Sequence, residues 1–145
     1  MKPPHFDLQQ VKRLAEEDRF ALGDGRACRG ALESYLHGEI GQYRPFAQRV
    51  IRELSLQDFW RTKRWPEPDG ELADEYGIRL PATVLEEFEV DISTWYVKVT
   101  IRQNRKGQSL FFMSLHPLAF VMDERNGGPL RPEKIGGTHG GFCLS

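Results

Sequence analysis

The stretch ISTWYVKVTIRQNRKGQSLFFMSLHP, Ile92 to Pro117, predicts a β-hairpin, and the rest of the fold follows from how this hairpin must pack. Apolar and polar residues alternate along WYVKVTI, so the first strand has one apolar and one polar side. The polar side carries Tyr96, Lys98, Thr100 and Arg102. An ordinary surface hairpin does not need this combination of a ring and two cations, so this side is a candidate functional surface.

The turn of the hairpin decides which way His116 points. A four-residue turn would put Ser114 on the apolar side, whereas a five-residue turn, with Gln103 opposite Ser109, makes that side uniformly apolar. The five-residue turn also sets His116 across from Tyr96. The residues then expected to be buried are Trp95, Val97, Val99, Ile101, Phe111, Met113 and Leu115.

Helices are predicted for the first half of the chain. Asp7 can cap a helix with apolar residues at helical spacing, and two further amphipathic stretches follow before Leu54. Ser55 is placed to cap a short helix that has Asp58 at its third position.

Two segments connect these helices to the hairpin. KRWPEPDGELADEYG, residues 63–77, is expected to be a loop because of its prolines and glycines. EFEVDI, residues 87–92, alternates like a strand that turns at Ser93 and Thr94 and pairs with WYVKVTI. Together the elements predict an α+β fold, with N-terminal helices packed on one face of a small antiparallel sheet.

Length and composition suit one domain. The 145 residues are 39% hydrophobic, which predicts one compact domain, here residues 1–117. Six glycines between Gly127 and Gly141 indicate that residues 118–145 form a flexible extension. Within that extension LAFVM, residues 118–122, is apolar enough to dock on the sheet or a partner. The formal net charge of -1 does not indicate a nucleic-acid-binding protein, so such a function needs a local patch.

The sequence gives no sign of export or membrane insertion. The start, MKPPHFDLQQVKRL, lacks a secretory signal, and no window has the apolar length that crosses a bilayer, so we expect a soluble, cytoplasmic protein. Neither Cys28 nor Cys143 has the surroundings of a zinc site, and we expect neither a metal nor a cofactor.

The polar side of the hairpin suggests chemistry on RNA. Metal-free cleavage needs a group that takes the 2′-hydroxyl proton, a cation or donor for the crowded phosphate, and a donor for the departing 5′-oxygen. His116, Tyr96 and Lys98 with a nearby arginine can fill these roles.

Structural interpretations compete with each of these assignments. Lys98 can simply pair with Glu89, and His116 can simply end a strand before Pro117. The basic run Arg61, Lys63 and Arg64 suits a solvated helix end as well as a phosphate patch, and residues 67–75 suit an acidic linker. Composition and spacing alone leave the function undecided.

Five segments occur in an order that resembles the MqsR toxins: PHFDLQQVKRL, RVIRELSLQDFWRTK, DEYGIRL, WYVKVTI and SLFFMSLHP. The resemblance covers most of residues 4–117. It implies a RelE-like α/β fold and a type II toxin-antitoxin ribonuclease that cuts mRNA without needing the ribosome. It also implies a cognate antitoxin as inhibitor, with any contact to operator DNA made only through that antitoxin.

The resemblance gives individual residues different weight. Tyr96 matches the family's active-site tyrosine, and Lys98 and Thr100 follow it in the same Y.K.T pattern. Arg61 and His116 stand where the family has lysines, and Ala73 stands where it has a glutamine. These departures put the family's preference for cutting around GCU in question.

The sequence therefore predicts a metal-independent mRNA-cleaving toxin, with an open sheet face that meets RNA. His116, Tyr96 and Arg61 are the expected catalytic residues. The expected RNA-binding residues are Lys98, Arg102, Ser114, Lys63 and Arg64. Two alternatives stay open: a non-catalytic RNA- or partner-binding module on the same fold, and a sheet face that is a protein interface.

Overall fold

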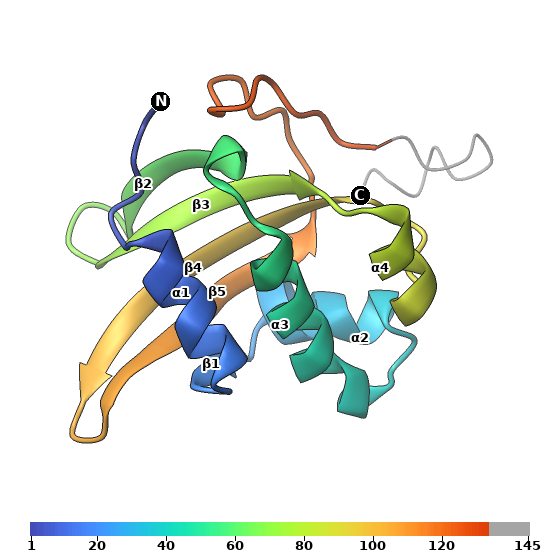
Figure 1. Ribbon diagram of the computed structural model, residues 1–145, viewed down its shortest axis with the longest axis horizontal. Coiled ribbons are helices and arrows are strands. Elements are labelled where there is room, and N and C mark those ends of the chain that lie inside the picture. Colours follow the sequence, from blue (N-terminus) through green and yellow to red (C-terminus); the bar gives the residue numbers. More distant parts are fainter. Residues whose placement is uncertain (134–145) are drawn as a thin grey trace.

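The computed structural model describes residues 1–133, which form a five-stranded sheet with four α-helices (Figure 1). The α-helices are α1 (Leu8–Glu16), α2 (Ala31–Tyr35), α3 (Tyr43–Glu53) and α4 (Ala82–Phe88). The strands are β1 (Phe20–Leu22), β2 (Phe59–Trp65), β3 (Glu71–Arg79), β4 (Thr94–Asn104) and β5 (Gly107–Pro117). Single turns of other helix types are η1 (Arg26–Gly30), η2 (Ile40–Gln42) and η3 (Leu56–Asp58). The predicted α+β class is confirmed.

The strands run in the order β1-β5-β4-β3-β2. The short edge strand β1 is parallel to β5, and the other neighbours are antiparallel. Helices α1 and α3 lie in front of the sheet in Figure 1, and apolar residues of α1, α2 and α3 form the main core with one face of it. This arrangement leaves the opposite face of β2 to β5 free of helices.

Capping residues start the predicted helices where the sequence places them. The Asp7 side chain accepts a hydrogen bond from the Gln9 backbone N–H at the start of α1. Ser55 and Asp58 form a capping box at η3, with the Ser55 N–H donating to the Asp58 carboxylate at 2.8 Å. Strand β1 was not predicted, because its three residues are too few to show an alternating pattern.

The predicted loop at residues 63–77 is wrong, because most of it belongs to strands β2 and β3. Only residues 66–70 form the turn between them. Asp74 and Glu75, interpreted as part of an acidic linker, have no exposed surface. Side-chain partners on both faces of the sheet compensate the burial of their charges, which a linear pattern does not reveal.

The strand predicted at residues 87–92 is also wrong. Phe88 ends helix α4, and Glu89 follows with a left-handed backbone (φ 55°). Phe88, Val90 and Ile92 are all buried, so the alternation in the sequence is real, but it arises from a helix end and a loop. Strand β3 pairs with β4 in its place, and Lys98 lies beside Glu75, not Glu89.

The hairpin is right at its base and wrong at its tip. Tyr96 pairs with His116 as predicted, but Gln103 pairs with Gln108, and the turn contains only two residues. An irregularity between Lys98 and Val99 inserts one extra residue in β5, which restores the predicted register toward the base. As a result Leu110 and Phe112 are fully buried, and the predicted Phe111 and Met113 are only half-buried.

Part of the predicted extension belongs to the folded structure. Residues 118–133 cross the helix-free face, where Leu118, Met122 and Leu130 are buried in a small second cluster with Tyr96. Of the two possibilities named for residues 118–122, the structure shows docking on the sheet. Residues 134–145, with Cys143, lie outside the described residues. Among residues 1–133, no helix has the length and apolar character needed to cross a membrane.

Candidate functional site

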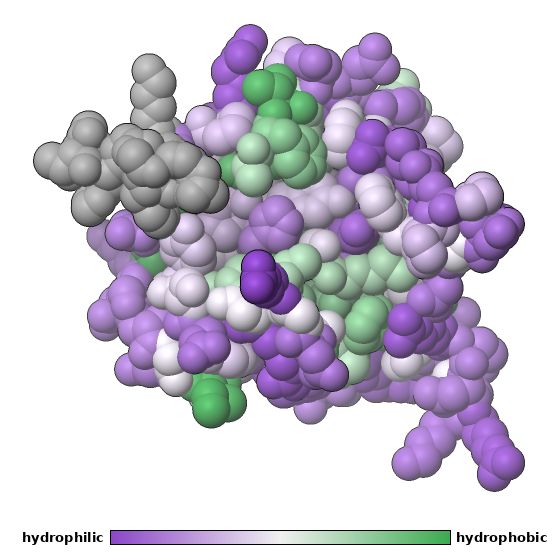
Figure 2. All heavy atoms as spheres, turned by 180° about the vertical axis from the view of Figure 1, so that it is seen from behind, coloured by the Kyte–Doolittle hydropathy of each residue, from purple (hydrophilic) through white to green (hydrophobic). Residues whose placement is uncertain are grey.

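The candidate site lies on the helix-free face of the sheet. Figure 2 shows this side of the molecule as a patchwork, with pale and apolar residues across the middle, single hydrophilic residues among them and a hydrophilic rim. Strand alternation brings side chains from four strands to this face. They are Arg61, Lys63 and Trp65 of β2, Glu71 and Glu75 of β3, Tyr96, Lys98, Thr100 and Arg102 of β4, and Ser114 and His116 of β5.

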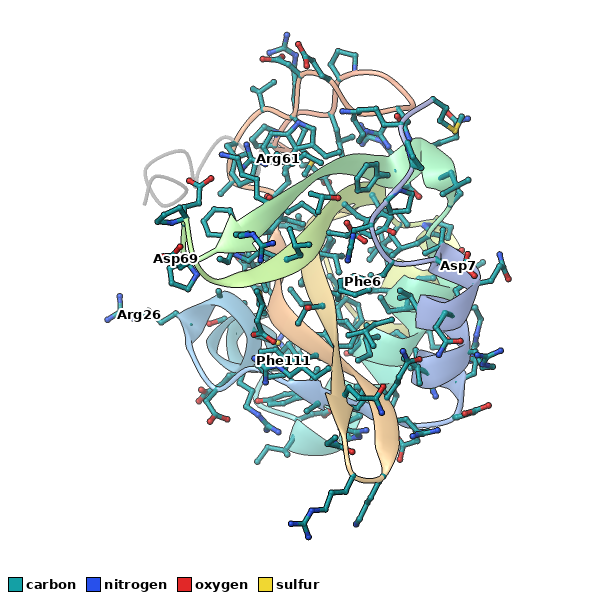
Figure 3. The ribbon with its side chains drawn as sticks, turned by 90° about the vertical axis from the view of Figure 1, so that its left-hand side faces the viewer. Phe6, Asp7, Arg26, Arg61, Asp69 and Phe111 are labelled. Atoms are coloured by element: carbon teal, nitrogen blue, oxygen red, sulfur yellow. The ribbon has the colours of Figure 1, made fainter. Side chains whose placement is uncertain are left out.

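A buried carboxylate is the centre of the site. Glu75 Oε1 accepts a hydrogen bond from the Tyr96 hydroxyl at 2.6 Å, and Oε2 accepts one from Arg61 Nε at 2.9 Å. Trp65 Nε1 donates to the same Oε2 at 3.3 Å. Glu75 has no exposed side-chain surface, whereas that of Arg61 is 34% exposed. Figure 3 shows Arg61 on the side of β2 away from Phe6 and Asp7, near the C-terminal segment.

Three cations on this face each lie over an aromatic ring. The Arg61 guanidinium is 3.8 Å from the centre of the Trp60 ring, Lys98 Nζ is 3.7 Å from that of Trp65, and the Arg102 guanidinium is 3.9 Å from that of Phe111. Such contacts hold each cation and ring together. A surface that alternates cations with half-exposed rings suits a ligand that has both phosphates and flat bases.

The pKa values of two groups beside Glu75 are displaced. Burial lowers the pKa of Lys98, although the nearby Glu75 charge works the other way. Burial, followed by the hydrogen bond to Glu75, raises the pKa of Tyr96, so its hydroxyl stays protonated at neutral pH. Tyr96 therefore acts here as a donor and not as a base.

His116 has one ring nitrogen already committed. Its Nδ1 lies 2.8 Å from the Pro117 carbonyl oxygen, and because a carbonyl only accepts, Nδ1 carries the hydrogen. The imidazole ring is 5.0 Å from the Tyr96 ring. Burial lowers the pKa of His116, a change that the Pro117 hydrogen bond opposes and the Lys98 charge supports. At neutral pH the free Nε2 is then an unprotonated base.

The structure does not bring all the predicted RNA-binding residues together. Arg102 pairs with Glu71 at 2.7 Å toward the tip of the hairpin, and Lys63 pairs with Glu67 at 3.3 Å. Ser114 faces the site beside Lys98 but is almost fully buried.

Arg64 was expected to bind RNA with Arg61 and Lys63, but it points to the other side of β2, because side chains alternate along a strand.

The expectation of an open Tyr96 is also wrong. Tyr96 is only 5% exposed, because Leu118, Met122 and Leu130 pack over it. Its ring lies 5.2 Å from that of Phe120, a residue of the same C-terminal segment. The face is right, but the segment covers part of it.

Glu75 is the functional candidate that the sequence did not identify. A signal was present, since Ala73, Glu75 and Gly77 occupy one side of ELADEYGI while Asp74 and Tyr76 occupy the other. The side chain of Asp74 faces the helices and accepts the backbone N–H groups of His5 and Phe6 at 2.9 and 2.8 Å. The two adjacent buried carboxylates thus have different roles: Asp74 binds the N-terminal segment, and Glu75 binds the side chains of the candidate site.

Other features of the described residues do not form a second site of this kind. No three His, Cys, Asp or Glu side chains within residues 1–133 are grouped so as to hold a metal ion. A shallow cavity of about 360 Å³ lies by the N-terminal residues Met1 to Pro4 and Leu56, away from Glu75.

Comparison with known proteins adds no assignment: the sequence matches no protein family, and no characterised protein matches it significantly.

Proposed function

We propose that the protein is a metal-independent endoribonuclease of the MqsR toxin type, which cleaves mRNA by attack of a 2′-hydroxyl on the adjacent phosphate. The observation that carries the proposal is the group around Glu75. A base, two cations and a hydrogen-bonded tyrosine lie on adjacent strands of one sheet face. This set contains the functions that metal-free RNA cleavage requires.

His116 is the proposed general base. Its Nε2 takes the proton of the 2′-hydroxyl while the 2′-oxygen forms a bond to phosphorus. The tautomer fixed by the Pro117 carbonyl leaves Nε2 unprotonated, and the lowered pKa keeps the ring neutral near pH 7.

Arg61 and Lys98 are the proposed partners of the phosphate. Arg61 keeps about a third of its side chain exposed, and Glu75 uses only its Nε, so its terminal nitrogens remain to donate to phosphate oxygens. Lys98 donates a proton to the departing 5′-oxygen as the phosphorus–oxygen bond breaks, and its lowered pKa favours this transfer. The products are a 2′,3′-cyclic phosphate and a 5′-hydroxyl.

Glu75 and Tyr96 have positioning roles in this mechanism. The carboxylate fixes Arg61 through Nε and keeps Tyr96 and Trp65 in place through their donors. The proposal also includes a cytoplasmic location and a cognate antitoxin that restrains the activity.

A second candidate function is RNA binding without cleavage. The coverage of Tyr96 by residues 118–130 favours it, because a site closed in this way is less accessible to a scissile phosphate. The three cation–ring contacts serve binding as well as they serve catalysis.

Incubation of the purified protein with a mixed-sequence single-stranded RNA in excess chelator tests the proposal. We expect fragments with cyclic-phosphate ends, and we expect His116→Ala to lose most of this activity. Binding without cleavage would support the second candidate. Fragments that carry 3′-hydroxyl ends would contradict the proposed chemistry.

A further inference from the structure

The C-terminal segment places an aromatic ring on the candidate site. The centre of the Phe120 ring lies 5.5 Å from that of Trp60 and 5.2 Å from that of Tyr96. Each of these rings also touches a proposed functional group, with the Arg61 guanidinium over Trp60 and His116 beside Tyr96. Phe120 therefore covers the rings that lie next to the proposed base and to one phosphate-binding cation.

The attachment of Phe120 is weaker than that of its surroundings. Leu118 and Met122, on either side of it, are buried, and Met122 exchanges two backbone hydrogen bonds with Leu130 at 2.9 and 3.1 Å. Phe120 is 37% exposed, and it lies in an arch of exposed residues, 119–121, between these fixed points. The ring can leave the site while the rest of the segment stays in place.

The segment is fixed further along by Arg125. Its guanidinium contacts the Asp58 carboxylate at 3.0 Å and the backbone carbonyl of Gly77 at 3.2 Å. Asn126 adds a backbone hydrogen bond to Phe59 at 3.0 Å. These bonds keep the arch close to the site whether or not Phe120 is in contact with it.

We propose that Trp60, with the part of the Tyr96 ring that Phe120 contacts, forms a nucleobase-binding subsite that Phe120 occupies when no RNA is bound, so that RNA and this ring compete for the same place. A nucleobase is flat and aromatic like the phenyl ring, and its phosphate would lie within reach of Arg61. The identity of the ligand as RNA rests on the proposed function, whereas the competing Phe120 ring is a feature of this chain. Phe120 would regulate the access of RNA to the proposed catalytic site.

The expected size of the effect follows from the contacts that are lost. Aromatic pairs of this geometry stabilise by an amount that corresponds to about a three- to tenfold change in an equilibrium constant. A ligand that must displace Phe120 has its apparent affinity reduced by that factor. Phe120→Ala should therefore tighten RNA binding about three- to tenfold.

Binding is measured by fluorescence anisotropy with a labelled, 2′-O-methylated single-stranded RNA, which the protein cannot cleave by the proposed chemistry. Val121→Ala is the matched control, since Val121 has the same 37% exposure in the same arch. It should leave the affinity unchanged. Thermal unfolding of the wild type, Phe120→Ala and Val121→Ala verifies that each protein is folded.

The outcomes separate this inference from the nuclease proposal when cleavage of an unmodified RNA is followed in parallel. Tighter binding by Phe120→Ala without cleavage by any variant retains the subsite and refutes the nuclease. Cleavage with unchanged or weaker binding by Phe120→Ala overturns the subsite and retains the nuclease. Equal tightening by Val121→Ala also overturns the subsite, and absence of both binding and cleavage by the wild type and both variants overturns the two proposals together.

Discussion

Glu75 concentrates the electrostatics of the site in one residue. A carboxylate without exposed surface is stable as an anion only if donors replace the water that it has lost, and here Arg61, Tyr96 and Trp65 supply them. The interaction connects strands β2, β3 and β4. It therefore contributes to the fold as well as to the arrangement of the proposed catalytic groups.

Glu75→Gln should lower the free energy of unfolding by about 1–3 kcal/mol, because Arg61 loses its buried counter-charge and the amide keeps only one of the two oxygens that accept hydrogen bonds from Tyr96, Arg61 and Trp65. Glu71→Gln is the control. Glu71 also belongs to β3 and pairs with an arginine, but that pair is 43% and 45% exposed, so its loss should cost about 0–1 kcal/mol. Urea denaturation measures both values, and equal losses would show that burial of Glu75 has no special weight.

His116 predicts a definite direction for the pH dependence of cleavage. Its pKa lies below the ordinary value of about 6.5 because of burial, so the neutral base predominates at pH 7. Activity should fall as the pH drops through that lowered pKa. His116→Lys should recover part of the activity that His116→Ala loses, but only at higher pH. Rates across the pH range check this, and a wild-type rate in His116→Ala would refute the role.

At the level of elements, Gly77 explains how the C-terminal segment reaches the sheet. A Cβ at this position would collide with Met122 Sδ and would lie 3.1 Å from Leu130. Gly77 pairs with Tyr96 across the strands, so the missing side chain leaves room for Met122 beside that ring. The glycine of strand β3 thus lies where the C-terminal segment packs on the strand.

Gly77→Ala should displace Met122 and destabilise the protein by about 1–3 kcal/mol, as overpacking does. Backbone amide exchange at Met122 and Leu130 should become faster, since these two residues bond to each other over the glycine. Gly41→Ala serves as control because its Cβ would have no neighbour within 4 Å. Unchanged exchange in Gly77→Ala would argue against close packing of the segment on β3.

The elements differ in how far the sequence could predict them. Helix α1 and η3 were predictable, because Asp7 and the pair Ser55 and Asp58 form local caps. Strands β2 and β3 were not, because prolines mark their turn and the charges of Asp74 and Glu75 find partners far along the chain. Local patterns record local interactions, and long-range compensation of a buried charge leaves no such record.

In the candidate site, too, the features that depend on local sequence patterns were predictable and those that depend on distant residues were not. Alternation along β4 correctly placed Tyr96 and Lys98 on one face, and the pairing of Tyr96 with His116 was also correct. The partner of these residues, Glu75, was missed because β3 was taken for a loop. The register at the hairpin tip was missed because a β-bulge adds a residue without any distinctive sequence signal.

At the scale of the whole molecule, the two faces of the sheet have different tasks. One face packs on the helices and forms the large core, while the other combines a small apolar cluster with the charged groups around Glu75. Leu118, Met122 and Leu130 of the C-terminal segment pack over part of this second face. A sheet supported on one side provides a rigid base for the proposed chemistry on the other.

The central claim is that the 2′-hydroxyl of RNA is the attacking group. It is tested most directly by mapping a cleaved bond in an RNA and then replacing the ribose on its 5′ side by a single 2′-deoxyribose. Arg61, Lys98 and His116 would still meet the same phosphate, but the proton that His116 takes would be absent. We predict that the unmodified RNA is cut at this bond and that the substituted RNA is not; cleavage of both at equal rates would contradict the account.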